Sequence, residues 1–323
     1  MPLLEVKDLD IHYHVQGGIL KAVEGISFSL EKGRSLGFVG ESGCGKTTLG
    51  MALMRLLPSN GFISDGQIIF DGEDIRKKNE EEMRKVRWQK ISMIFQAAMN
   101  ALNPVQRVGN QIVEAITTHS PLLKKDEAFK MVKNLFQLVG IPGDRIKDYP
   151  HQYSGGMKQR AVIAMALACK PKLIIADEPT TALDVIVQDQ ILQEIKGLQE
   201  EFQISIIFIS HDISVVANVS HEIGIMYAGE LVEYGNTEEV FESPRHPYTK
   251  ALLSSYPTLN GEKNMLTPIP GETPNLMNPQ TGCRFFDRCP NAISSCKINP
   301  AEWVTISPTH KVLCYQCGRD CGI

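Results

Sequence analysis

Short runs of apolar residues alternate with longer segments of mixed polarity over the first 240 residues of the chain. The four clearest runs lie at Leu36–Val39, Ile91–Phe95, Leu173–Ala176 and Ile206–Ile209. Apolar runs of this length are typical of strands that are covered on both faces, as in a parallel sheet. The pattern therefore predicts an α/β fold.

The segments between these runs carry apolar residues at helical spacing. In Gln188–Phe202, apolar side chains recur every three or four residues and fall on one face of a helix. The interval 97–156 contains no comparable apolar run and includes helix-like stretches such as Glu127–Val139. We predict that this interval is a mostly helical insertion.

A different alternation marks the N-terminal part of the chain. Ile11, Tyr13 and Val15 alternate with polar residues, as in a strand with one exposed face. Such strands belong to antiparallel sheets, so we expect a small antiparallel β subdomain. The predicted core then comprises residues 1–96 and 157–240.

The cysteines point to a further module at the C-terminal end. Cys44 and Cys169 are the two cysteines of the first 282 residues, and the last 41 residues contain six: Cys283, Cys289, Cys296, Cys314, Cys317 and Cys321. The proline-rich stretch Pro268–Pro279 precedes them and fits an extended connector, because proline interrupts helices and central strands. We predict a small Cys-rich domain within 241–323.

Composition excludes several classes of protein. The 33 basic and 37 acidic residues give a net charge of −4, which argues against a protein whose main task is to coat nucleic acid. No apolar run is long enough to span a bilayer, and the first residues lack the pattern of a signal peptide. We therefore expect a cytoplasmic chain whose cysteines are free thiols or metal ligands.

A glycine-rich segment follows the first apolar run and precedes a helical pattern. It fits G-x-x-x-x-G-K-T, the phosphate-binding loop, in the strand–loop–helix context that the loop requires. Backbone N–H groups of such a loop surround phosphate oxygens, and the helix N-terminus adds positive charge. Lys46 is expected to reach the β and γ phosphates, and Thr47 to bind Mg²⁺. The predicted nucleotide ligands are Gly40, Ser42, Gly43, Cys44, Gly45, Lys46, Thr47 and Thr48.

Two carboxylates follow the apolar run Leu173–Ala176. Ligands of open α/β sheets bind where parallel strands end, which is the position of Asp177 and Glu178. Asp177 is placed to hold Mg²⁺, and Glu178 to polarise an attacking water. Capping of the next helix is the alternative, but the phosphate-binding loop favours a catalytic interpretation.

The segment Ser154-Gly155-Gly156 opens a further helical stretch and lies 17 residues before Leu173. Taken alone it is best explained as an N-cap with a flexible lead-in, although it also offers backbone donors to an anion. The order of motifs decides between these interpretations. The phosphate-binding loop, the insertion, this turn and the Asp-Glu pair resemble, over residues 3–240, the ATPase subunit of an ABC transporter.

This resemblance implies a P-loop NTPase fold that hydrolyses ATP with Mg²⁺. It also implies a head-to-tail dimer in which each ATP lies between the phosphate-binding loop of one chain and Ser154, Gly155 and Gly156 of the other. Further residues match family motifs. Gln96 matches the Q-loop glutamine, which touches Mg²⁺ or the attacking water and couples the site to the membrane subunits, and Ala182–Asp184 matches the D-loop, which lines the dimer contact. His211 matches the switch histidine, which contacts the γ-phosphate, and Tyr13 the aromatic residue that stacks on adenine.

Local strings resemble the subfamily that energises uptake of dipeptides and oligopeptides. They are Ala101–Pro104, Tyr149–Arg160, His246–Leu253 and Pro268–Gly271, and members of this subfamily also serve nickel and some sugar-linked ligands. The resemblance implies a peripheral protein on the cytoplasmic face of the membrane. Its implied partners are two transmembrane permease subunits, a second, similar ATPase subunit or a second copy of this chain, and indirectly a substrate-binding protein; no nucleic-acid partner is expected.

The C-terminal cysteines have the spacing Cys283-x5-Cys289-x6-Cys296-x17-Cys314. The resemblance implies that these four hold a [4Fe–4S] cluster, and four thiolates also suit Zn²⁺. Disulfides are a third possibility, against which the expected compartment argues. Cys317 and Cys321 depart from the subfamily pattern, and either could replace Cys314 as a ligand.

Two other functions compete with peptide import. A soluble ABC-type ATPase acting on DNA or ribosomes would be expected to carry long coiled-coil insertions, two cassettes or a basic stripe, and the chain has none of these features. A redox-regulated ATPase is the second alternative, and the cysteine cluster motivates it.

Overall fold

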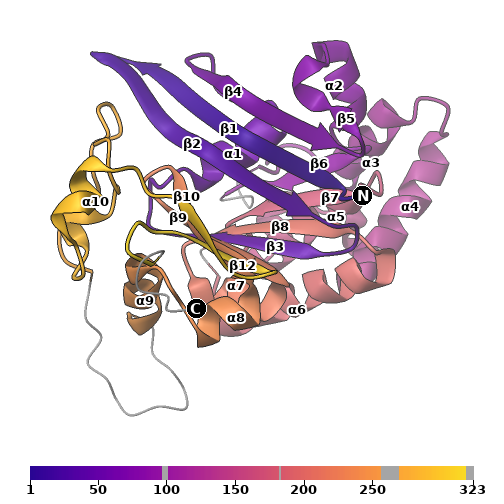
Figure 1. Ribbon diagram of the computed structural model, residues 1–323. Coiled ribbons are helices and arrows are strands. Elements are labelled where there is room, and N and C mark those ends of the chain that lie inside the picture. Colours follow the sequence, from indigo (N-terminus) through magenta and orange to yellow (C-terminus); the bar gives the residue numbers. More distant parts are fainter. Residues whose placement is uncertain (97–100, 182, 256–268, 318–323) are drawn as a thin grey trace. The chain divides into compact units, whose positions relative to one another are not determined.

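The computed structural model describes residues 1–96, 101–181, 183–255 and 269–317 (Figure 1). Backbone contacts divide the chain into two compact units. The helical unit comprises Met1, Glu31–Arg34 and Ile75–Phe208. The sheet unit comprises Pro2–Leu30, Ser35–Asp74 and Ile209–Ile323. The predicted division into 1–96 with 157–240, 97–156 and 241–323 follows the sequence pattern rather than backbone contacts, and it stays a prediction.

The sheet unit contains a four-stranded antiparallel sheet, with the strand order β2-β1-β4-β5 (Figure 1). Its strands are β1 (Leu4–Val15), β2 (Gly18–Leu30), β4 (Gly61–Phe70) and β5 (Glu73–Asp74). The predicted alternation holds in part, because Ile11 of β1 is buried and Tyr13 is half-buried. It ends before Val15, which is 36% exposed, because the tip of the β1–β2 hairpin extends past the buried part of the strand.

A second sheet in this unit has the order β11-β12-β10-β9-β3. Its strands are β3 (Ser35–Val39), β9 (Glu222–Tyr227), β10 (Glu230–Asn236), β11 (Trp303–Ser307) and β12 (His310–Leu313). Strands β3 and β9 are parallel, and all five residues of β3 are buried, as its apolar run predicted. The other pairs are antiparallel.

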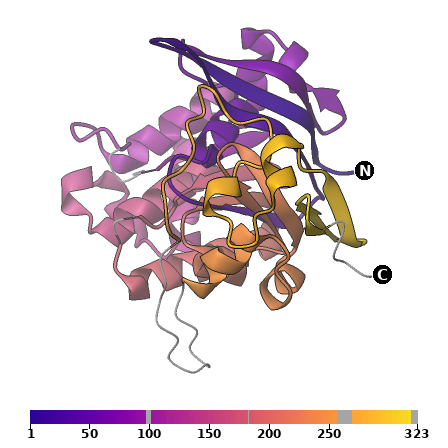
Figure 2. The same cartoon turned by 60° about the vertical axis from the view of Figure 1, so that its left-hand side comes forward.

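The C-terminal hairpin β11–β12, drawn in yellow in Figure 2, is part of this second sheet. β12 pairs with β10, with Val312 opposite Glu233. The described part of the extension therefore continues the sheet, and a separate Cys-rich domain is not confirmed. Cys321 lies outside the described residues.

The helices of the sheet unit are short, and two of them begin at a side chain that accepts backbone hydrogen bonds. They are α1 (Lys46–Leu53), α7 (Ile213–Val219), α8 (Thr237–Glu242), α9 (Pro247–Ser254) and α10 (Ser294–Ile298). Asp212 caps α7 by accepting hydrogen bonds from the backbone N–H groups of Ser214 and Val215. His246 caps α9, and Pro247 supplies the fixed φ that suits a first helical residue.

The helical unit has the strand order β8-β7-β6. The strands are β6 (Ile91–Ile94), β7 (Leu173–Asp177) and the first part of β8 (Ser205–Ser210). β6 and β7 are parallel and fully buried, which confirms the pattern expected from their apolar runs.

Five α-helices of the described residues accompany these strands. They are α2 (Glu80–Val86), α3 (Val108–His119), α4 (Lys125–Leu138), α5 (Gly155–Leu167) and α6 (Val185–Phe202). α3 and α4 lie in the interval that was predicted to be a helical insertion, and the described residues 101–156 contain no strand. Among the described residues, none of the helices combines the length and the apolar character needed to cross a membrane.

A fully buried carboxylate ties β10 to the elements that follow it in the chain. Glu233 accepts hydrogen bonds from the backbone N–H groups of Arg245 at 2.7 Å and His246 at 2.9 Å, and from Nε2 of His310 at 2.7 Å. The His246 ring is also buried, and its Nδ1 accepts from the N–H of Tyr248. Burial lowers the pKa of His246 to about 4, although the Glu233 charge opposes this shift.

This pKa predicts an acid-sensitive contribution to stability. A histidine with a pKa near 6.5 when unfolded and about 4 when folded stabilises the protein above pH 6.5, and this contribution is lost as the pH falls toward 4. The parent should therefore lose free energy of unfolding between pH 7 and pH 4.5. We expect His246→Asn, which keeps a capping side chain, to lose roughly 2 to 3 kcal/mol less over the same interval. Denaturant titrations at both pH values measure this difference. The exposed His151→Asn is the control, and a loss in His246→Asn as large as in the control would contradict the expectation.

Candidate active site

The predicted phosphate-binding loop lies in the sheet unit, between the buried strand β3 and helix α1. Gly45 precedes the helix with φ at 104°, a left-handed conformation that glycine adopts without strain. A Cβ atom on Gly40 would lie 2.0 Å from the carbonyl oxygen of Met226, and one on Gly45 would lie 2.6 Å from that of Ala22. The loop thus requires glycine where it touches neighbouring backbone.

The Lys46 side chain lies inside this loop. Its ammonium donates to the carbonyl oxygens of Gly40 at 2.7 Å and Glu41 at 2.9 Å, and it lies 3.4 Å from Sγ of Cys44. Burial raises the pKa of the Cys44 thiol, so this side chain is a neutral packing group. The remaining loop residues are more open, since Ser42, Gly43 and Thr47 are exposed.

Two other predicted residues belong to the same unit. The Tyr13 hydroxyl and Oγ1 of Thr48 are 3.1 Å apart, so the residue expected to stack on adenine contacts the first turn of α1. His211 is exposed and directly follows β8. The structure therefore brings Tyr13 to the loop.

The carboxylates lie in the helical unit. Asp177 ends β7 and is 1% exposed, and Glu178 has φ at 47°, which is uncommon for a residue with a side chain. Ile94 is paired with Ala176 in the parallel register of β6 and β7. Gln96 therefore lies at the same sheet edge as the two carboxylates.

The Thr181 hydroxyl donates to Oε2 of Glu178 at 2.7 Å. This contact fixes one carboxylate oxygen of a residue that already has an unusual backbone conformation. Sequence reasoning missed Thr181. Its only signal was a hydroxyl three residues after Glu178, which is a common spacing for contacts within a turn.

The predicted Ser-Gly-Gly turn also lies in the helical unit. Oγ of Ser154 accepts the N–H of Met157 at 3.3 Å and caps α5, while Ser154 and Gly155 are exposed. The buried Tyr153 fixes the segment that precedes this turn, because its hydroxyl donates to the carbonyl oxygen of Arg145 at 2.9 Å. A fixed turn with exposed donors is suited to an anion that arrives from outside the chain.

The start of α6 lies beside this turn. A Cβ atom on Gly156 would lie 3.1 Å from Cγ1 of Val187. Asp184 caps α6 by accepting the N–H of Val187 at 3.0 Å, and the next residues, Val185 and Ile186, are 81% and 73% exposed. Ala182, part of the same predicted motif, lies outside the described residues.

The described C-terminal cysteines all belong to the sheet unit, and none forms a disulfide. Burial raises the pKa of the Cys283 thiol to about 12, and negative charge on Cys314 or Cys289 adds to this effect. A hydrogen bond from Cys317 lowers the pKa of Cys314 to about 6. These thiols are close enough for their charges to interact. Nevertheless, within the described ranges no three His, Cys, Asp or Glu side chains are arranged to hold a metal ion.

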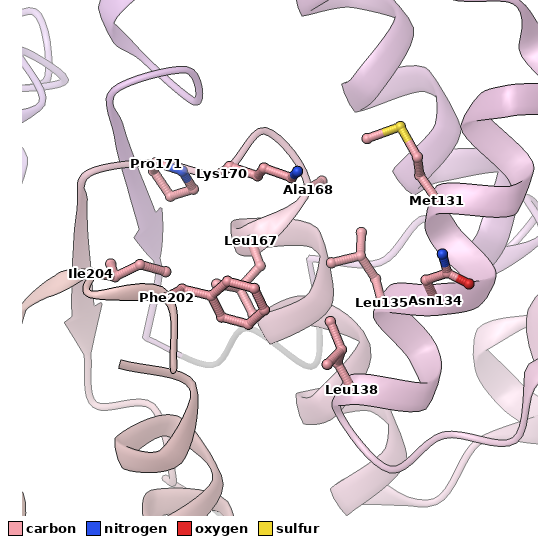
Figure 3. Close-up of a pocket in the computed structure, with 10 residues that line it drawn as sticks. All are labelled: Met131, Asn134, Leu135, Leu138, Leu167, Ala168, Lys170, Pro171, Phe202 and Ile204. Carbon is pink, nitrogen blue, oxygen red and sulfur yellow. The ribbon is translucent and has the colours of Figure 1, made fainter. Parts of the chain in front are cut away.

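An apolar pocket of about 380 Å³ lies elsewhere in the helical unit (Figure 3). It is lined by α4, by the segment before β7 and by the end of α6, with Leu135, Pro171 and Phe202 among its residues. Pro171 precedes β7, whereas Asp177 ends it. The pocket therefore lies at the opposite end of β7 from Asp177 and the predicted catalytic Glu178.

Comparison with known proteins identifies the class. The family model described as ABC transporter matches residues 23–181. The structure titled "Dimeric structure of a post-hydrolysis state of the ATP-binding cassette MJ0796 bound to ADP and Pi" matches with a TM-score of 0.65 and 26% identity, over 72% of this chain and 98% of that chain. The fold is that of an ABC ATPase, and the protein is an ATP-hydrolysing enzyme.

A second family model, described as "Oligopeptide/dipeptide transporter, C-terminal region", matches residues 232–296. The dipeptide transport ATP-binding protein DppD of Bacillus subtilis is 46% identical, over 97% of this chain and 94% of that protein. The oligopeptide transport ATP-binding protein OppD of the same organism is 48% identical, over 96% of this chain and 87% of that protein. The chain therefore belongs to the dipeptide and oligopeptide transport family of ABC ATP-binding proteins.

The packing around the loop makes a prediction about its glycines. Gly40→Ala would place a methyl group against the Met226 carbonyl, and we expect it to lower the free energy of unfolding by about 1 to 3 kcal/mol. Gly197→Ala is the matched control, since its Cβ meets open space within α6 and alanine is the better helix former. That control should raise stability by up to about 1 kcal/mol. The midpoints of thermal unfolding measure both effects. Midpoints that shifted in the same direction would refute the prediction.

Proposed function

We propose that this chain is the ATPase subunit that powers import of dipeptides or oligopeptides through an ABC transporter. The observation that carries the proposal is that two regions of the chain match: an ABC ATPase core at residues 23–181, and at residues 232–296 a C-terminal region described for oligopeptide and dipeptide transporters. The names of the relatives support the same substrate class. The position of the protein is then the cytoplasmic face of the membrane.

The proposed chemistry assigns one task to each predicted residue. Lys46 and the loop amides bind the phosphates, and Tyr13 stacks on adenine. Mg²⁺, when bound, neutralises phosphate charge, and the oxygen-bearing side chains of Thr47, Gln96 and Asp177 suit this hard cation. Glu178 orients the attacking water and accepts its proton, and His211 contacts the γ-phosphate.

A second ATPase subunit completes the proposed site. Ser154 and Gly155 present their polar groups to solvent, and the exposed aliphatic side chains of Val185 and Ile186 follow the Asp184 cap. Exposed aliphatic groups beside an anion-binding turn suit a contact with another protein. In this proposal the partner is a similar ATPase or a second copy of the chain. Two permease subunits then receive the motion through the surface around Gln96 and the helical insertion, and a substrate-binding protein acts indirectly.

Glu178→Gln tests the proposed catalytic assignment. The variant keeps the shape of the side chain but cannot accept a proton, so ATP should still bind while hydrolysis falls by about 10² to 10⁴-fold. Measurements are ATP affinity, phosphate release and uptake of a labelled dipeptide by cells that carry the permeases. Glu200→Gln, the same change at an exposed position of α6, is the control. Hydrolysis at the parental rate would show that Glu178 is not the catalytic residue. Dipeptide uptake that did not depend on the parent protein would refute the proposed substrate class.

We also propose a metal centre, a [4Fe–4S] cluster or alternatively Zn²⁺, at Cys283, Cys289, Cys296 and Cys314. Its support is the electrostatic interaction among these thiols and a backbone hydrogen bond of 2.8 Å from Cys283 to Cys296. The side chains as arranged do not form a ready metal site, so binding requires them to turn toward one another.

Elemental analysis decides between the possible occupants of this site. Protein purified without oxygen should contain iron and sulfide in equal amounts and lose both in Cys283→Ser. Cys169→Ser is the control, because Cys169 lies in the helical unit. Zinc without iron would replace the cluster by a zinc site, and protein free of both metals would remove the proposal.

A further inference from the structure

The C-terminal extension contacts the phosphate-binding loop through a buried arginine. Arg288 lies three residues after Phe285 and directly precedes Cys289 in the sequence, and its side chain is 5% exposed. Its two terminal nitrogens donate to the two carboxylate oxygens of Glu41, at 2.7 and 2.8 Å. A two-pronged contact of this kind fixes the orientation of a carboxylate as well as its position.

Other groups hold the same arginine in place. Its Nε donates to the carbonyl oxygen of Pro270 at 2.8 Å, and one terminal nitrogen donates to the Tyr227 hydroxyl at 3.3 Å. Its charge lies 5.6 Å from the centre of the Tyr227 ring. Because these contacts already hold its guanidinium group, Arg288 loses little conformational freedom when it binds Glu41.

Glu41 is held through each of its polar groups. Its carboxylate binds Arg288, its backbone N–H donates to the Tyr248 hydroxyl at 3.0 Å, and its carbonyl oxygen accepts from Nζ of Lys46 at 2.9 Å. Glu41 occupies the second position of the glycine-rich loop. A single loop residue therefore connects the extension to the lysine that was predicted to bind phosphate.

We propose that Arg288 is a positioning residue for nucleotide binding, which acts through Glu41 on the backbone of the loop and on Lys46. The loop binds phosphate through backbone donors, so its affinity depends on how well its conformation is fixed before ATP arrives. The extension thereby becomes part of the ATP site. This inference rests on the proposed role of the loop in binding ATP.

A second arginine of the extension provides a matched control. Arg284 is also buried, but it pairs with Glu24 and Glu230 and donates to the carbonyl oxygen of Ala228. It anchors the same segment without touching Glu41. Loosening of the extension in general would therefore affect Arg284 and Arg288 variants alike, whereas positioning through Glu41 would affect Arg288 variants alone.

The experiment is a double-mutant cycle on ATP affinity in the full chain. We expect Arg288→Gln and Glu41→Gln each to weaken binding of ATP with Mg²⁺ about tenfold, and the double variant to be no weaker than either single variant. Arg288→Lys keeps the charge but not the fork, so its affinity should be intermediate. Arg284→Gln should bind ATP within about twofold of the parent, at a comparable loss of thermal stability.

Additive effects of the two substitutions would overturn the inference, as would an Arg284→Gln variant that lost as much affinity as Arg288→Gln. Should Arg288→Gln fail to fold, Glu41→Gln with Arg288→Lys still decides the question, because unchanged affinity in both would overturn it. Lys46→Ala separates this inference from the proposed function. A parent that binds ATP no better than Lys46→Ala would overturn both. If affinity were lost in Lys46→Ala but intact in the Arg288 and Glu41 variants, the inference alone would fall.

Discussion

The backbone of the phosphate-binding loop imposes the constraint on which the rest of the sheet unit depends. A loop that offers most of its N–H groups to a phosphate has few left to hold itself together, so it depends on support from outside. Here the support comes from steric contacts and from hydrogen bonds. The glycines at positions 40 and 45 let the loop lie directly on the carbonyls of Met226 and Ala22, and Glu41 reaches Tyr248 and Arg288. Both of the latter come from residues after the ATPase core.

Buried polar contacts of the same kind join the C-terminal residues to the sheet. Glu233 lies on β10 with no exposed surface, and it is satisfied by two backbone donors and by His310 of β12. A buried carboxylate without these donors would be costly, so β10, the start of α9 and the hairpin depend on one another. The extension is thus held by the sheet at one point and bound to the loop at another. A family model that covers residues 232–296 as one region agrees with this continuity.

Four buried strands and the motif-bearing turns could be predicted from the sequence, because both depend on local patterns. The apolar runs gave β3, β6, β7 and β8 to within a residue or two, and the glycine, serine and carboxylate motifs gave the loop and the turn of α5. The supporting residues could not be predicted. Arg288 lies 247 positions from Glu41, and nothing near either residue signals the other. Thr181 and Tyr153 show the same limitation, because a hydroxyl in a sequence does not reveal which oxygen it will meet.

The exposure of the two aliphatic side chains that follow Asp184 affects how the protein behaves in a cell. Val185 and Ile186 project into water at the start of a helix, where a surface built only for solubility would carry charge. Surface that favours assembly is a liability before assembly, because it attracts any other apolar surface that it meets. In the proposed dimer a second ATPase subunit covers these side chains, so synthesis of this chain in excess of that subunit would carry a risk of aggregation.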